Sequence, residues 1–120
     1  MPDPSPRILL RIPDLMAEVR VQAALAADGL SAETVSVADW PGAVTTARPP
    51  ALAVVDLAAP GAVGAVALAA AGELTVVAFG PHVDAAALSA ARDAGATTVL
   101  ARGDFLQHAA RRVREALGTV

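Results

Sequence analysis

Five short apolar runs alternate with five segments of helical length along this chain, and no other feature constrains its fold as strongly. Each run has the length of a strand, and most contain β-branched residues. The runs cover Arg7–Ile12, Glu33–Ala38, Ala51–Leu57, Leu74–Phe79 and Thr97–Arg102. The helical segments cover Asp14–Asp28, Trp40–Arg48, Gly61–Ala71, Asp84–Ala94 and Asp104–Leu117. The pattern predicts a (βα)5 domain.

Residues that begin and end helices stand where this pattern needs them. An aspartate opens four helical segments, where its carboxylate can accept hydrogen bonds from free backbone N–H groups. These aspartates are Asp14, Asp39, Asp84 and Asp104. A glycine follows four of the helices, where a left-handed backbone costs least. These glycines are Gly29, Gly72, Gly95 and Gly118, while Pro49 and Pro50 end the second helix.

Successive βα units form a parallel sheet with helices on both faces. The centres of the first, third and fourth runs are continuously apolar, as central strands are; they are Ile8–Leu10, Leu52–Val55 and Val76–Phe79. Thr34–Val37 instead alternates in the manner of an edge strand. We therefore predict an α/β fold, a doubly wound parallel sheet in the flavodoxin-like order 2-1-3-4-5. A site would lie at the carboxyl ends of strands one and three. One domain is expected over residues 7–118, after a flexible N-terminal tail at residues 1–6.

Composition argues against several functional classes. The net charge of −3 disfavours nucleic-acid binding. The absence of cysteine excludes disulfides and thiolate metal sites and fits a reducing cytoplasm. The longest uncharged run, Leu57–Gly72, is too short to span a bilayer, and the N-terminus lacks a signal-peptide pattern. We expect a cytoplasmic protein that binds neither nucleic acid nor a membrane.

Asp56 ends the third apolar run, with Pro60 four residues and Gly64 eight residues further on. This spacing resembles the CheY-like receiver domains of bacterial response regulators, whose phosphoacceptor aspartate ends strand three. Ala94–Ala96, before the fifth run, is similar to the A-G-A turn of the same family. The resemblance extends from about Arg7 to Leu117 and implies a role in two-component signal transduction.

The rest of that family's phosphorylation pocket is missing. The resemblance implies an acidic pair after strand one, a Thr or Ser after strand four and a Lys after strand five, which hold Mg²⁺ and offset the charge of the phosphoryl group. In ungapped register these positions hold Ile12 and Pro13, Gly80, and Arg102. Neither Ile12 nor Pro13 can ligate a metal through its side chain. We therefore predict a degenerate phosphorylation pocket around Asp56, with no catalytic residue, metal site or cofactor.

Asp14 and Arg102 leave a second interpretation open. Asp14 could act as a substitute acid if the first loop shifts by one residue, although an aspartate there also suits the N-cap of the first helix. Arg102 could hold a phosphate, but it is not equivalent to lysine. We expect Arg102 to pair with Asp56 and neutralise it where the metal is missing.

The third helical segment, Gly61–Ala71, contains no polar side chain. A helix that is apolar all round is usually covered on every side. We predict that it forms a self-association or partner surface, made by Val63, Ala65, Val66 and Ala69. The resemblance to receivers keeps the face of the fourth and fifth helices as the rival interaction site.

These features predict a non-catalytic pseudo-receiver, a signalling or scaffold module that binds another signalling protein, or a second copy of itself, independently of phosphorylation. Since the chain ends at Val120, directly after the fifth helix, we expect its output to pass through partner contacts. Two alternatives stay open. One is a phosphoacceptor receiver that uses Asp56 and Mg²⁺ in a phosphorelay, and the other is a small flavodoxin-like ligand-binding domain.

Overall fold

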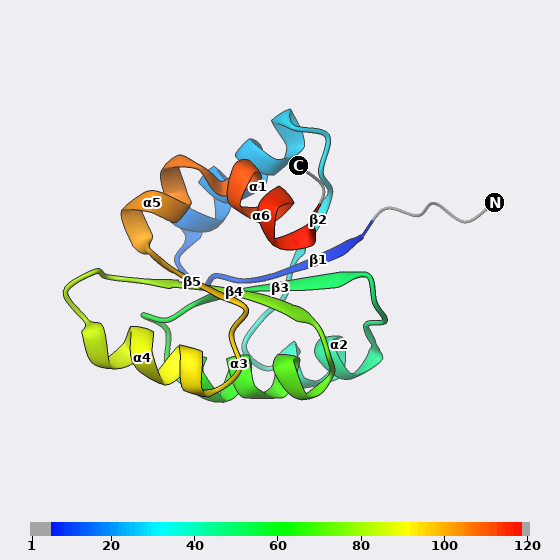
Figure 1. Ribbon diagram of the computed structural model, residues 1–120. Helices are drawn as coiled ribbons and strands as arrows, with labels where there is room; N and C mark the ends of the chain where they lie inside the picture. The colour runs from blue at the N-terminus through cyan, green and yellow to red at the C-terminus, as the bar shows by residue number, and fades with distance from the viewer. Residues whose placement is uncertain (1–5, 119–120) are drawn as a thin grey trace.

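The computed structural model describes residues 6–118 and shows a five-stranded parallel sheet between two layers of helices (Figure 1). The strands lie in the order β2-β1-β3-β4-β5, so the predicted flavodoxin-like fold is confirmed. They are β1 (Arg7–Arg11), β2 (Ala32–Thr34), β3 (Ala51–Asp56), β4 (Thr75–Gly80) and β5 (Thr98–Ala101). Apart from Pro6, the predicted tail at residues 1–6 lies outside the described residues.

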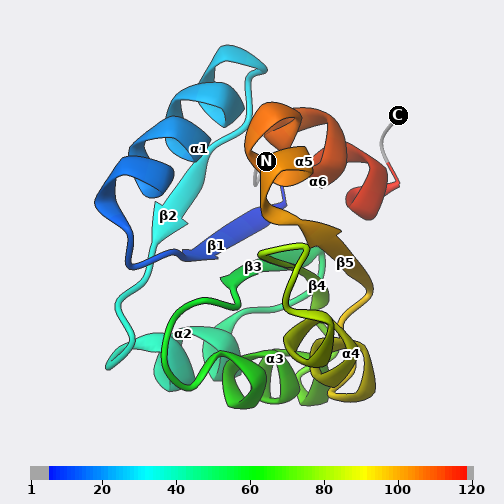
Figure 2. The same ribbon diagram turned by 90° about the vertical axis from the view of Figure 1, so that its left-hand side faces the viewer.

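Helices cover both faces of the sheet (Figures 1 and 2). One layer contains α1 (Leu15–Ala27), α5 (Arg102–Gln107) and α6 (Ala109–Leu117). The other contains α2 (Trp40–Thr46), α3 (Ala62–Ala71) and α4 (Ala85–Asp93). None of the helices within residues 6–118 is long and apolar enough to cross a lipid bilayer.

Each layer encloses its own buried apolar cluster, because successive strand residues point to opposite faces of the sheet. Under α1, α5 and α6, the rings of Phe79 and Phe105 stack with their centroids 4.7 Å apart. Under α2, α3 and α4 the cluster is mostly alanine and valine. Its aromatic residue is Trp40, whose indole N–H donates to the carbonyl oxygen of Ala65 at 3.1 Å.

The helix caps follow the sequence in part. The side chains of Asp14 and Asp84 accept hydrogen bonds from the third residue beyond each of them, at 3.2 and 3.0 Å. Asp39 occupies the N-cap position of α2, but its side chain makes no capping hydrogen bond.

One glycine prediction is wrong. The backbone is left-handed at Gly29, Gly95 and Gly118, whereas Gly72 has φ −83°. The positive φ falls one residue later, on Glu73 at 63°. The amides of both Gly72 and Glu73 bond to the last turn of α3, so the chain leaves the helix through a turn one residue longer than predicted.

The second strand and the fifth helix also differ from the prediction. β2 ends at Thr34, and the backbone N–H of Val35 makes the last bond to β1 before the chain turns away as a loop to α2. The fifth helix begins early, at Arg102, and is broken at His108 (φ −133°, ψ 34°) into α5 and α6. Asp104 therefore lies inside the first turn of α5 rather than capping it, and its carboxylate accepts hydrogen bonds from Arg112.

Candidate functional site

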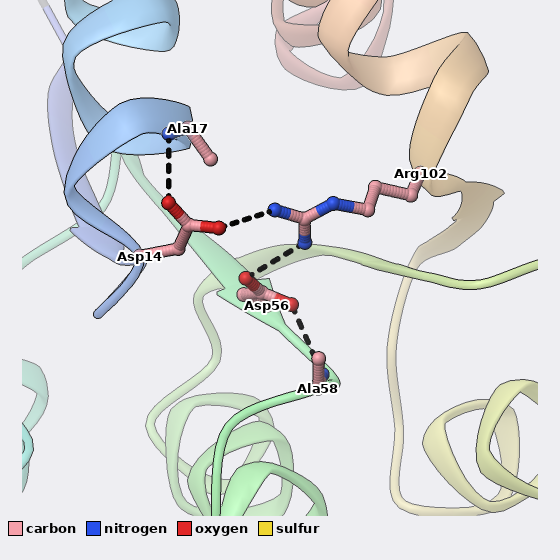
Figure 3. Close-up of polar contacts among 5 residues, drawn as sticks. All are labelled: Asp14, Ala17, Asp56, Ala58 and Arg102. Atoms are coloured by element: carbon pink, nitrogen blue, oxygen red, sulfur yellow. Dashed lines mark hydrogen bonds and ion pairs between the residues drawn. The ribbon is translucent and has the colours of Figure 1, made fainter.

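Three charged side chains from distant parts of the sequence meet at the carboxyl edge of the sheet (Figure 3). Asp56 ends β3, Arg102 follows β5 as the first residue of α5, and Asp14 precedes α1. Arg102 donates from Nη1 to Oδ2 of Asp56 at 3.0 Å and from Nη2 to Oδ2 of Asp14 at 3.1 Å. The predicted pairing of Arg102 with Asp56 is confirmed, and the guanidinium bridges two carboxylates instead of one.

Asp56 is deeply buried, with 3% of its side chain exposed. A buried carboxylate must be hydrogen-bonded and paired with a positive charge. Its Oδ1 accepts from the backbone N–H of Ala58 at 3.0 Å, and its Oδ2 accepts from Arg102. The Arg102 guanidinium carbon also lies 5.6 Å from the centroid of the Phe79 ring, within the range of a cation–π contact. Both oxygens of Asp56 are therefore engaged by the protein itself.

Asp14 serves two purposes at once. Its Oδ1 accepts from the backbone N–H of Ala17 and caps α1, which confirms the N-cap interpretation. Its Oδ2 accepts from Arg102. Asp14 thus lies close to the site, as a substitute acid would, but it is bonded to an arginine there.

The residues at this edge do not fit the Mg²⁺ site of a working receiver. Ile12 is 3% exposed and packs into the core beneath α1, and Pro13 offers no side-chain ligand. Within the described part of the chain, no three His, Asp or Glu side chains are grouped closely enough to hold a metal. The two acidic side chains that are present, Asp14 and Asp56, both form ion pairs with the guanidinium of Arg102.

Gly80, at the position of the family's hydroxyl residue, is tightly enclosed. A Cβ atom added there would lie 3.1 Å from Cβ and 3.5 Å from Cδ1 of Leu57. This position has no room for a serine or threonine side chain unless Leu57 moves. A pocket of about 500 Å³ above the site is lined by Asp14, Asp56, Arg102 and three prolines.

The predicted interaction surface on α3 is wrong for Ala65, Val66 and Ala69, which are buried, and stays a prediction for Val63. Ala65, Val66 and Ala69 are 6%, 0% and 0% exposed, and of the four proposed residues only Val63 is exposed, at 39%. The reason is that α3 is the middle helix of its layer, where it packs against the sheet and is flanked by α2 and α4. Burial explains the apolar residues on the inner side of this helix.

Arg11, the last residue of β1, also lies at this edge and was not predicted from the sequence. Arg11 is 3% exposed, and its Nη2 donates to the carbonyl oxygen of Pro60 at 3.0 Å. Its Nε and Nη1 are buried without a hydrogen-bond partner among the described residues. Burial lowers the pKa of Arg11, and the negative charge of Asp56 opposes that shift. The sequence did contain a signal for this burial. Arg11 lies two residues after Leu9 and therefore on the same face of β1, and both faces of the predicted sheet are covered by helices.

The sequence itself matches no known family model and no curated protein. The fold and the edge site together define a flavodoxin-like α/β domain with a buried carboxylate at the end of its third strand. Within that class, the solved structures that it resembles include response regulators and their receiver domains.

Three solved structures illustrate the likeness. A CheY-like receiver domain from Methanospirillum hungatei is 14% identical with a TM-score of 0.80, covering 95% of this chain and 94% of its own. An orphan response regulator of H. pylori is 18% identical, with a TM-score of 0.79 and coverage of 97% and 99%. A response regulator from Thermotoga maritima is 15% identical, with a TM-score of 0.78 and coverage of 95% and 98%. The fold of this chain is that of response-regulator receiver domains.

Proposed function

We propose that this chain is a pseudo-receiver, a signalling or scaffold module that acts by binding another protein and does not need phosphorylation. One observation carries the proposal: Arg102 bridges Asp56 and Asp14 at the place where a working receiver would hold Mg²⁺. We also propose that the protein binds no metal ion or cofactor and catalyses no reaction.

The charges at the carboxyl edge support this function. Arg102 places a fixed positive charge between Asp14 and Asp56, where a receiver's metal ion would otherwise supply positive charge. A divalent cation would have to displace Arg102 from both carboxylates, and Ile12 adds no acidic ligand in return. Without the cation, little offsets the repulsion between the Asp56 carboxylate and a negatively charged phosphoryl group.

The same ion pairs favour a single state of the site. Arg102 is the first residue of α5, so its bonds to Asp56 and Asp14 hold the beginning of α5 against β3 and α1. Because these ion pairs already order the edge, the added charge of a covalent phosphate is not needed. We infer that partner binding depends on a permanently assembled surface.

Exposed apolar side chains beside the site support a protein partner. Leu15, Met16 and Val19 on α1 are 72%, 82% and 56% exposed. Leu15 and Val19 are four residues apart and share one helix face. With Arg20, Arg102 and Leu106 these residues line a pocket of about 510 Å³. Clustered exposed apolar side chains of this kind mark interaction sites in soluble proteins.

The proposal is tested by adding Mg²⁺ with beryllofluoride, a stable mimic of an aspartyl phosphate, to ¹⁵N-labelled protein. We expect no shift of the Asp56 and Ala58 amide signals. Saturable shifts at these amides that disappear in Asp56→Asn would contradict the proposal and favour the phosphoacceptor alternative.

A gain-of-function variant provides the matched control. Ile12→Asp and Pro13→Asp restore the acidic pair, and Arg102→Lys restores the family's lysine and removes the bridging guanidinium. We expect this triple variant to show Mg²⁺-dependent shifts at Asp56 that the wild-type protein lacks. If the variant folds but shows no Mg²⁺-dependent shifts, the lack of the acidic pair and of the lysine is not what prevents metal binding.

A further inference from the structure

A second cluster at the carboxyl edge lies on the opposite face of the sheet from Asp56 and Arg102. Arg11 shares its strand face with Leu9, which belongs to the core beneath α2, α3 and α4. Its side chain lines a pocket together with Trp40, Gly61 and Gly64. The pocket therefore lies between the end of β1 and the beginnings of α2 and α3.

The guanidinium of Arg11 is the least satisfied polar group in this cluster. Nη2 has one acceptor, the Pro60 carbonyl oxygen, whereas Nε and Nη1 are buried with no partner in the described part of the chain. Asp56 acts on Arg11 through space, but among the described residues the two side chains form no ion pair. A buried cation with too few acceptors is costly, and an anion within reach of Arg11 would offset that cost.

The beginning of α3 faces the same space. No side chain caps this helix, so the backbone N–H groups of its first turn lack side-chain acceptors. Gly61 has φ 74°, and a Cβ atom added there would lie 3.5 Å from Nη2 of Arg11. The beginning of α3 is therefore close to the guanidinium. Gly64 has open space where its Cβ would be. The missing side chains leave this turn accessible to a ligand, and helix N-termini favour negative charge.

We propose that this pocket binds a small oxyanion of phosphate or carboxylate chemistry, held between Arg11 and the first turn of α3. Its volume is about 160 Å³, and no acidic side chain lines it. At about 30 Å³ per water, that is the space of about five waters, which suits one phosphate or acetate ion and is too small for a nucleotide. The site does not rest on the proposed function, because it uses neither Asp56 nor Arg102.

Trp40 makes the proposal directly measurable. It is the only tryptophan in the chain and lines this pocket, so its fluorescence reports on an occupant. Wild-type protein is titrated at constant ionic strength with inorganic phosphate and, separately, with acetate. We expect a saturable change, accompanied by a shift of the Arg11 Nε–H signal in NMR spectra. Tighter binding of phosphate assigns the ligand to phosphates, and tighter binding of acetate assigns it to carboxylates.

Two pairs of variants locate the binding. Arg11→Met should weaken it at least about tenfold, the loss of one charge-assisted hydrogen bond, while Arg48→Met, an exposed arginine of the same layer, should not weaken it. Gly64→Glu places a carboxylate in the pocket and should compete with the free anion, whereas Ala67→Glu, on the exposed side of α3, should not. Thermal unfolding checks that each variant is folded.

Two results would overturn the proposal. One is the absence of saturable change in both Trp40 fluorescence and the Arg11 signal with either anion. The other is undiminished affinity in folded Arg11→Met and Gly64→Glu. Neither result bears on the response to beryllofluoride at Asp56, so the two proposals fail independently.

Discussion

The two helical layers are held together by different means. In the layer of α1, α5 and α6, ion pairs join separate elements: Arg102 with Asp14 and Asp56, and Arg114 with Asp28. Within the described residues, no ion pair connects α2, α3 and α4 with one another or with the sheet. That layer is packed from small apolar side chains around Trp40.

The difference shows how charge is distributed in this fold. Among the described residues, the first face buries one charged side chain, Asp56, and both of its oxygens accept hydrogen bonds. The second face buries Arg11, two of whose donors have no partner within residues 6–118. Paired charges hold the first face together at its edge, whereas the ligand that we propose for Arg11 would supply the partner that the second face lacks.

Removing an aromatic ring from the first layer should have the largest effect. Phe105→Ala breaks the stack on Phe79 and leaves a cavity in a fully buried site. We expect it to lower the free energy of unfolding by about 3–5 kcal/mol in urea denaturation. Leu106→Ala, at a partly buried position of the same helix, should cost clearly less. Equal costs for the two variants would mean that the stack does not anchor α5.

Overfilling the second layer should have the next largest effect. Ala69 is 0% exposed in a core built from small side chains. Ala69→Leu is expected to destabilise the protein by about 1–3 kcal/mol, because the added methyl groups have no space. Ala67→Leu, on the exposed side of the same helix, is the matched control and should be nearly neutral. A neutral Ala69→Leu would show that this layer is loosely packed.

Removing the guanidinium of Arg102, which bridges Asp14 and Asp56, should leave Asp56 buried without a counterion. We expect Arg102→Met to lower the free energy of unfolding by about 2 kcal/mol, since hydrogen bonds to charged groups are lost. Adding Asp56→Asn to that variant removes the stranded charge and should recover part of the loss. A double-mutant cycle in urea measures the coupling, and a coupling of zero would mean that the pair contributes nothing.

The smallest effect should have the opposite sign. Burial lowers the pKa of Arg11, which means that the folded state disfavours its charged form relative to the unfolded chain. Arg11→Met removes that cost and loses one hydrogen bond, to Pro60. Without added anion, we expect a net stabilisation of about 1 kcal/mol. Arg48→Met should change little, and destabilisation by Arg11→Met would mean that the bond to Pro60 outweighs the burial of the charge.

The sequence predicted the fold well because its signals are local. Strand and helix lengths, the aspartate caps and the alternation at the edge strand each act within a few residues, and together they indicate the strand order. The break at His108 was not predictable in this way, because the apolar spacing continues from α5 into α6. The N-cap at Asp14 and the pairing of Arg102 with Asp56 were predicted because both follow from the ends of elements.

The sequence predicted less about what surrounds each residue in space. The apolar character of α3 was read as an interaction surface, but the covering elements are its own neighbours, α2 and α4. Arg11 was passed over as part of an apolar run, because one arginine changes the hydrophobicity of a strand little. Its importance comes from burial and from two missing acceptors, which only the assembled structure displays.

Gly80 has a consequence for any attempt to place a hydroxyl group at the end of β4. The nearest atom to an added Cβ is the Cβ of Leu57, at 3.1 Å, and every residue except glycine carries such an atom. Shortening the Leu57 side chain would therefore leave that contact in place, and a serine at position 80 requires the backbone at residue 57 to move as well. Two neighbouring strand ends would have to be redesigned together.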